Sequence, residues 1–342
     1  MRETEMFFTS ADGISEVRAL LWVPEGLAEG GSVADARCML QILHGMAEHI
    51  ERYRHFAEFC TGRGYIVFGH DHIGHGKSVK SEEQWGLLPM NGKDILIEDA
   101  HKLRLMMQER FAEGTGGDKG TGRLSPCQEG DKRPVPLSPC VPYLMLGHSM
   151  GSFVERLYLT LYGEGVTAAI ISGTGQQSPL LSASGAFIAR LLSATKGKDY
   201  RSPLLYELSV GTASKQIENA HTPLDWLSTD EAVVADYAAD PGCGFRFGSS
   251  ANYAITSLTG SMVKRKTIAA VPAALPLLFI SGEEDPVGGK GVGVKQAVKL
   301  FRDTGHTDVT LILYEGMRHE VLNEVNKAQV YQDIAEWIEE RL

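Results

Sequence analysis

Short apolar runs of the kind that form buried β-strands recur along the 342-residue chain. Most are followed by a stretch whose apolar residues stand at helical spacing, and residues 6–10 and 15–23 before them predict a hairpin. The runs lie at residues 38–43, 65–68, 144–146, 166–173, 277–282 and 309–314. Strands that alternate with helices favour a mostly parallel sheet covered by helices on both faces. We therefore expect an α/β fold with eight strands.

The alternation is interrupted twice. Between residues 174 and 262 the pattern changes to helical stretches at 180–194 and 228–239, with several prolines and many aromatic residues. We interpret this segment as a lid over the carboxyl ends of the strands, inserted into a core domain formed by residues 1–173 and 263–342. Residues 113–142 are rich in Gly, Lys, Asp, Pro and Ser, which predicts a surface insertion that is partly disordered.

A GxSxG pattern follows the third apolar run. Gly147 and Gly151 stand two residues to either side of Ser149, and a helical pattern comes next. A serine that projects its hydroxyl from the end of a sheet needs a sharp strand-to-helix turn, which small neighbours permit. In a chain with 38 glycines such a pentapeptide also occurs by chance, so its place between strand and helix is the stronger evidence. We interpret Ser149 as a nucleophile and expect the Met150 amide to face the oxygen of the attacked carbonyl.

A serine hydroxyl is a weak nucleophile near neutral pH and needs a base, which a buried carboxylate in turn orients. The order serine, acid, histidine is typical of a strand-turn-helix nucleophile. Asp285 and His319 fit this order, since each stands in a loop directly after a C-terminal strand. Glu283 and Glu284 compete for the role of the acid. We prefer Asp285 because the proline after it predicts a fixed turn.

The loop after residues 38–43 can supply a second donor for the oxyanion, the Met46 amide. His44 and Gly45 form a tight bend that would aim this amide, and a purely structural role of His44 is equally compatible with the sequence. Further along, the glycine- and histidine-rich loop at 69–78 is too polar to be expected in the core.

Six short segments spread over nearly the whole chain carry a recognisable set of motifs. They are LHGMAEH at 43–49, RY at 52–53, DHIGHGKS at 71–78, GHSMGS at 147–152, ISGEEDPV at 280–287 and YEGMRHE at 314–320. Together they resemble the monoacylglycerol lipase and lysophospholipase branch of the α/β-hydrolases, also classed with serine aminopeptidases. DWLS at 225–228 and DPGCGF at 240–245 resemble bacterial members, whereas the insertion at 113–142 is longer than is usual in the family.

The resemblance implies the α/β-hydrolase fold and a serine ester hydrolase that needs no metal or cofactor. Ser149, Asp285 and His319 would form the triad, and the amides of Met46 and Met150 the oxyanion hole. The supporting residues around the nucleophile would be His44, Gly45, Gly147, His148 and Gly151. Members of the family remove a single acyl chain from a glyceryl headgroup.

The sequence leaves the substrate open. An apolar stripe at helical spacing between residues 180 and 192 suits an acyl tunnel or a transient membrane contact, and equally a lid helix packed on the core. A lysophospholipase and a generalist carboxylesterase remain alternatives, because the basic residues of the lid are too scattered to decide. An aminopeptidase would use acidic lid residues, namely Glu207, Glu218, Asp225, Asp230 and Glu231. A non-catalytic binding protein on the same fold is a further alternative.

Composition narrows the partners. A formal charge of −10 argues against nucleic acid. Since we find neither a secretory signal nor a run of about 18 apolar residues, we expect a cytoplasmic protein. The five cysteines suggest reduced thiols, with Cys38, Cys60 and Cys243 buried. Cys127 and Cys140 each end a Leu-Ser-Pro-Cys copy, and a disulfide or metal role stays open for them.

Overall fold

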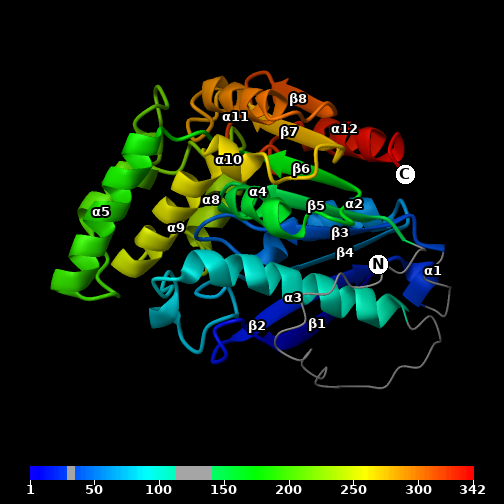
Figure 1. Ribbon diagram of the computed structural model, residues 1–342, viewed down its shortest axis with the longest axis horizontal. Coiled ribbons are helices and arrows are strands. Elements are labelled where there is room, and N and C mark those ends of the chain that lie inside the picture. The colour runs from blue at the N-terminus through cyan, green and yellow to red at the C-terminus, as the bar shows by residue number, and fades with distance from the viewer. Residues whose placement is uncertain (29–34, 113–140) are drawn as a thin grey trace.

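The computed structural model describes residues 1–28, 35–112 and 141–342. These residues form one eight-stranded sheet with the order β1-β2-β4-β3-β5-β6-β7-β8 (Figure 1). The strands are β1 (Arg2–Thr9), β2 (Glu16–Val23), β3 (Cys38–Leu43), β4 (Tyr65–His70), β5 (Tyr143–His148), β6 (Ala168–Ser172), β7 (Leu277–Gly282) and β8 (Val309–Tyr314). The β1–β2 and β2–β4 pairs are antiparallel and the other neighbours are parallel. The predicted α/β fold with a mostly parallel sheet is confirmed.

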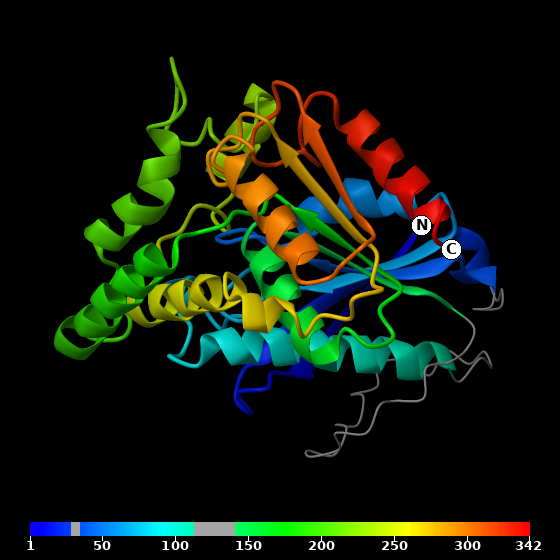
Figure 2. The same cartoon turned by 45° about the horizontal axis from the view of Figure 1, so that its top comes forward.

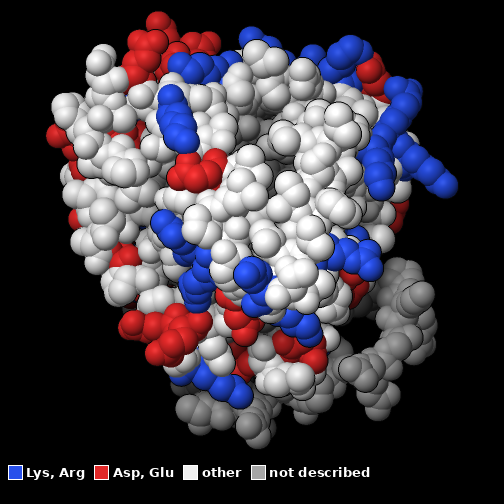
Figure 3. Space-filling view, turned by 90° about the vertical axis from the view of Figure 1, so that its left-hand side faces the viewer, with Lys and Arg blue, Asp and Glu red and all other residues white. Residues whose placement is uncertain are grey.

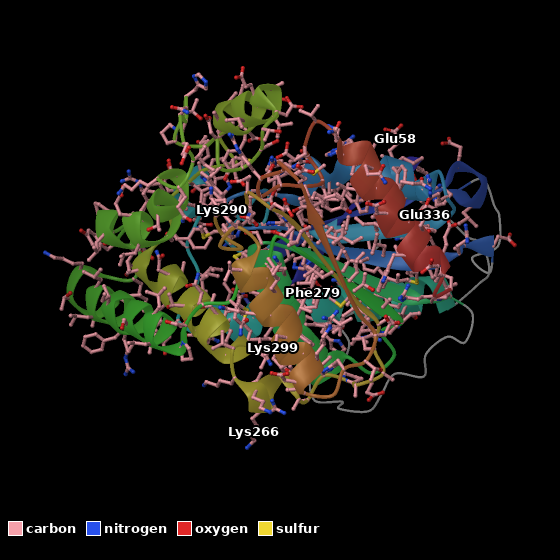
Figure 4. All side chains as sticks on the ribbon, turned by 90° about the horizontal axis from the view of Figure 1, so that it is seen from above. Glu58, Lys266, Phe279, Lys290, Lys299 and Glu336 are labelled. Atoms are coloured by element: carbon pink, nitrogen blue, oxygen red, sulfur yellow. The ribbon has the colours of Figure 1, made fainter. Side chains whose placement is uncertain are left out.

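Helices cover both faces of this sheet, which explains why its strands have continuous apolar runs. In β6, Ala169 and Ile171 pack into the core beneath α3, α4 and α11, whereas Ala168 and Ile170 pack toward α2 and α12. The helices are α1 (Glu25–Ala28), α2 (Arg54–Thr61), α3 (Gly92–Ala112), α4 (Met150–Tyr162), α11 (Val292–Asp303) and α12 (Lys327–Glu339), with short turns at Ile50–Tyr53 and Glu82–Gln84. Figure 4 shows Phe279 of β7 inside the molecule and Glu58 and Glu336 on the outer sides of α2 and α12.

Residues 174–262, called the inserted segment below, connect β6 toward β7. The helical elements from here to β7 are α5 (Pro179–Lys196), α6 (Pro203–Tyr206), η4 (Glu207–Gly211), α7 (Thr212–Ser214), α8 (Glu231–Ala239), α9 (Ser249–Met262) and α10 (Arg265–Ile268). Helices α5 and α9 lie side by side at one end of the molecule, and both chain ends lie at the other (Figures 1 and 2). A Cβ at Gly185 of α5 would stand 3.0 Å from Thr256 Cγ2 of α9, so glycine permits this close packing.

The histidine-rich loop at 69–78 is buried, so the expectation that it lies outside the core is wrong. His70, His72 and His75 are fully inaccessible to solvent. The His72 ring contacts the rings of His70 and His75, and the His44 ring contacts those of His72 and His75. Asp71 in the same loop accepts hydrogen bonds from the Ile50 and Lys77 amides and pairs with Arg18. The histidine rings pack in the core against one another and against aromatic side chains, since His70 contacts Phe8 and His75 contacts Phe245 and Phe247.

Candidate active site

The turn between β5 and α4 holds Ser149 in a strained conformation. Its φ of 52° and ψ of −118° lie in a region that residues with a side chain rarely adopt. The two glycines around it are required by close contacts. A Cβ at Gly147 would stand 2.6 Å from the Gly151 carbonyl oxygen, and a Cβ at Gly151 would stand 2.0 Å from that of Leu43. The strand and helix context predicted for Ser149 is therefore present.

Asp285 and His319 meet at the same edge of the sheet. The Asp285 carboxylate Oδ2 lies 3.0 Å from Nδ1 of His319, and both side chains are buried. Burial lowers the pKa of His319, but the charge and hydrogen bond of Asp285 outweigh it and raise this pKa above its ordinary value. Glu283 and Glu284, the competing acids, are both exposed, and Glu284 pairs with Lys290. The structure thus brings Asp285 and not Glu284 to the histidine.

A cavity of about 870 Å³ opens above these residues. Ser149 and His319 line it together with Met46 and Met150, whose amides are the expected oxyanion donors. Its other walls come from the loop after β7, from α4 and α11, and from the inserted segment, chiefly α5, η4, α7 and α9. Figure 3 shows the end of the molecule formed by α5, where the surface is hollowed between mostly uncharged side chains. The cavity is in the size range of sites for small organic molecules.

His44 acts within the bend that follows β3. Its Nε2 accepts a hydrogen bond from the His72 amide at 2.9 Å, so Nδ1 carries the proton and donates to the Gly45 carbonyl oxygen at 2.8 Å. Both ring nitrogens are thus used to hold the backbone that leads to Met46. Of the two roles that the sequence left open, the structural one agrees with these contacts.

A buried ion-pair network, not foreseen from the sequence, connects the loops after β3 and β8. Arg52 donates to both carboxylate oxygens of Glu320 at 2.7 Å and also to Glu48. Glu48 in turn accepts from the Gly45 amide and from the Tyr53 hydroxyl. Glu320 directly follows the candidate base, and Glu48 fixes the bend before the expected oxyanion donor. Arg52 therefore links the loop that carries His319 to the loop that carries Met46. The i,i+4 spacing of Glu48 and Arg52 was the only local signal of this network.

His148 lies buried next to the base, with its ring centre 4.8 Å from that of His319. Burial, together with the neighbouring His319, lowers the pKa of His148 to about 3, so it stays uncharged beside the base. The Trp226 ring also packs against His319, with 5.1 Å between the two ring centres. The Glu320 amide donates to the Leu227 carbonyl oxygen at 2.7 Å, which anchors the inserted segment to the loop of the base.

One group among the described residues has the donor types of a metal site: His49, Asp240 and Cys243, whose potential ligand atoms lie within 4.8 Å of one another. The side chains of Asp240 and His49 are already engaged with each other, however. One Asp240 oxygen bonds His49 Nε2 and the other accepts from the Gly242 amide, both at 2.8 Å. Burial raises the pKa of the Cys243 thiol, which disfavours the thiolate that a metal requires. Cys38, Cys60 and Cys243 are buried as predicted, and Cys127 and Cys140 lie outside the described residues.

The chain is similar to known lipases and esterases over nearly its whole length. A family model described as "Serine aminopeptidase, S33" matches residues 34–113 and 134–326. The monoacylglycerol lipase of Mycolicibacterium smegmatis is 27% identical over 95% of this chain and 94% of its own length. The human monoglyceride lipase is 25% identical over 89% of this chain and 83% of its own. A thermostable carboxyl esterase from Bacillus coagulans, solved with glycerol, is similar in structure, with a TM-score of 0.83, 28% identity and coverage of 100% and 99%.

Proposed function

Because the chain belongs to the serine aminopeptidase S33 family and is a carboxylic ester hydrolase, we propose that it cleaves the acyl ester of a monoacylglycerol through an acyl-enzyme on Ser149. The observation that carries the proposal is the Asp285–His319 hydrogen bond at the cavity that Ser149 also lines. It supplies an oriented base next to a serine on a strand-to-helix turn, which is the arrangement that acyl transfer needs.

The mechanism follows from the two nitrogens of His319. Nδ1–H donates to Asp285, which leaves Nε2 free to accept the proton of the Ser149 hydroxyl as its oxygen attacks the ester carbonyl. The amides of Met46 and Met150 stabilise the oxyanion. His319 then gives the proton to the departing glycerol oxygen, and the acyl group stays on Ser149. Water, deprotonated by His319, attacks this ester, and the proton returns to Ser149 as the fatty acid leaves.

The charges of the cavity favour a neutral headgroup over a phosphate. Among the described residues no Lys or Arg lines the cavity, and its two acidic lining residues, Glu48 and Glu320, are both bound to Arg52. A phosphate inside the cavity would therefore find carboxylates nearby and no free cation. This supports a monoacylglycerol over a lysophospholipid.

The acidic residues that an aminopeptidase would use do not reach the cavity. None of the five named from the sequence is among its lining residues. Glu207 pairs with Lys215, Asp225 accepts hydrogen bonds from the His221 and Thr222 amides, and Asp230 begins α8 as its N-cap. A free amino terminus would have no unengaged carboxylate to bind there, which favours the ester over the peptide.

We further propose that the inserted segment is a lid that touches a lipid surface. Several of its apolar side chains are exposed, among them Leu180 (78%) and Phe187 (69%) of α5 and Leu204 and Leu208 beyond it. Leu181 is exposed on the same helix and also lines the cavity. An apolar face next to the cavity would let an acyl chain pass from a membrane into the site without crossing water. The structure has no helix in its described residues that is long and apolar enough to span a membrane, and we keep the cytoplasm as the proposed compartment.

A substrate panel tests the proposed function. Monoacylglycerols of graded chain length, lysophosphatidylcholine, p-nitrophenyl esters and an aminoacyl anilide are offered to the wild type and to Ser149→Ala. Preferred turnover of long monoacylglycerols that disappears in the variant supports the proposal. Preferred turnover of lysophosphatidylcholine, of short esters alone or of the anilide would contradict the substrate class, and no turnover at all would point to a binding protein.

A further inference from the structure

A buried glutamate stands behind the nucleophile turn. Glu155 of α4 is fully inaccessible to solvent, and its Oε2 accepts a hydrogen bond from the Gly147 amide at 2.9 Å. The other carboxyl oxygen, Oε1, has no hydrogen-bond partner among the described residues. Gly147 is the second residue before Ser149. A buried carboxyl is costly unless it has a partner or a purpose, so this contact calls for an explanation.

The surroundings of Glu155 favour its uncharged form. Arg156, the next residue along the chain, donates instead to Gln176, Thr174 and backbone carbonyls. Arg104 of α3 donates to Tyr158 and to the carbonyls of Tyr162 and Glu164, and Tyr158 also bonds His101.

From β5, the acid Tyr143 is a further titratable group near Glu155, and burial is the main cause that raises the pKa of this tyrosine. Burial raises the pKa of Glu155 well above its ordinary value, and the Gly147 amide offsets this only in part. Among the described residues no Lys, Arg or His side chain donates a hydrogen bond to Glu155, so burial favours the protonated carboxyl.

We propose that Glu155 is a positioning residue for the nucleophile, an uncharged carboxyl that fixes the Gly147 amide and thereby the strained turn at Ser149. The inference rests on the proposed role of Ser149. Strained backbone persists only where its surroundings hold it, and Glu155 holds the strand side of this turn. A Cβ at Gly147 would stand 2.7 Å from Glu155 Oε2. The glycine of the motif thus makes room for the carboxyl as well as for the turn.

The role predicts a separation between two substitutions. Glu155→Gln keeps a carbonyl oxygen for the Gly147 amide and should keep kcat within about threefold, whereas Glu155→Leu leaves that amide unpaired. In Glu155→Leu kcat should fall by about 10²-fold with KM nearly unchanged, because misplacing a reacting atom by about 1 Å has an effect of this size. Glu164→Leu, an exposed position just beyond α4, is the matched control and should leave both constants unchanged.

Two readouts do not depend on the ester that is cleaved. The rate at which a fluorophosphonate labels Ser149 should fall in Glu155→Leu in parallel with kcat. Infrared spectroscopy in D₂O should show the C=O stretch of a protonated carboxyl at neutral pH in the wild type, absent in Glu155→Gln.

Failure of this inference is distinguishable from failure of the proposed function. A wild type that labels on Ser149 but turns over none of the esters would contradict only the substrate. An unchanged labelling rate in folded Glu155→Leu, or a missing infrared band, would overturn the role of Glu155. If Glu155→Leu does not fold, Glu155→Gln decides, since loss of its labelling rate at neutral pH would refute an uncharged acceptor.

Discussion

The loops at the carboxyl edge of the sheet and the inserted segment above them hold their side chains in opposite ways. In the loops, Asp285, His319, Glu48 and Glu320 are at most 4% exposed and each has a charged or hydrogen-bonding partner. In the inserted segment, large apolar side chains such as Phe187 face solvent. A reaction needs fixed groups, whereas the entry of a flexible lipid needs an adaptable surface. We therefore expect the loops to determine the chemistry and the inserted segment, as the proposed lid, to determine which substrates reach it.

The strongest test of the loops is Ser149→Ala. We expect ester hydrolysis to fall by about 10⁶-fold, because the nucleophile and its base act as one unit. The thermal midpoint should stay near that of the wild type, since the substitution removes a single hydroxyl. Turnover retained in a folded variant would refute Ser149 as the nucleophile.

Replacing the acid should have the next largest effect. Asp285→Asn preserves the shape of the side chain but removes the charge that stabilises the histidine cation, and we expect a loss of about 10⁴-fold in kcat. It should also shift the acidic limb of kcat/KM to lower pH, because Asp285 raises the pKa of His319 and the base must be uncharged to act. Glu284→Gln is the matched control, and a larger loss there than in Asp285→Asn would assign the acid to Glu284.

Breaking the network between the loops should affect stability. Arg52→Met leaves two buried carboxylates without their cation, and we expect the free energy of unfolding in urea to fall by about 3–5 kcal/mol. Arg54→Met removes an exposed arginine that pairs with Glu3 and should cost at most about 1 kcal/mol. Equal losses in the two variants would show that the buried network contributes no more to stability than an exposed ion pair.

The buried histidines of the 69–78 loop should make the fold sensitive to acid. Burial lowers the pKa of His75 to about 4 and that of His70 to about 3. Below about pH 6.5 these histidines bind protons in the unfolded chain but stay unprotonated in the folded chain. The contribution of each of these histidines to the free energy of unfolding is therefore fully present above about pH 6.5. It is lost as the pH falls toward 4, by about 1.4 kcal/mol per pH unit for each histidine.

Variants at two histidines check this dependence by urea unfolding at several pH values. His75 is flanked by Phe245 and Phe247, so a phenylalanine fits in its place. In His75→Phe the free energy of unfolding should change less steeply with pH, because unfolding takes up one proton fewer. His221→Gln, at an exposed position in the inserted segment, should leave it unchanged. A slope that does not respond to His75→Phe would argue against titration in the core.

The smallest effect is expected in the inserted segment. The double substitution Leu180→Ser and Phe187→Ser should lower turnover of monoacylglycerol in vesicles by roughly tenfold. This corresponds to about 1.4 kcal/mol, a part of the roughly 1.5–3 kcal/mol that a fully buried apolar side chain contributes. Turnover of a monomeric short ester should stay within about twofold. Leu161→Ser, a similarly exposed leucine on α4, is the control, and an equal loss there would remove the case for a lipid-facing lid.

The sequence predicted those strands and helices in which the apolar residues follow a single clear spacing. Strands buried on both faces read as unbroken apolar runs, and the parallel strands bring the loops that carry Ser149, Asp285 and His319 to one edge. Helix α9 was not predicted, because its buried face consists largely of Ser, Ala and Thr and shows little apolar contrast. The burial of the 69–78 loop was missed because ring contacts between polar residues leave no pattern along the chain.

Contacts between distant positions were likewise beyond the sequence. Arg52 and Glu320 are 268 residues apart, and nothing near either residue indicates the other. Glu155 lies in the predicted helix after the nucleophile, where a charged residue suggests an exposed side. Its inward orientation follows from the close approach of α4 to β5 at the glycines of the turn. Contacts of this kind, between residues far apart in the sequence, can be identified only in the folded structure.

The two chain ends lie at the end of the molecule opposite α5 (Figures 1 and 2). This gives the protein a natural orientation for immobilisation. A solid support or a fused fluorescent domain attached at either end would leave the α5 side pointing away from the attachment, toward the bulk phase. The same geometry means that a protein attached in this way to a sensor surface would present the α5 side to added vesicles, so that the proposed lipid contact could be tested without modifying that side.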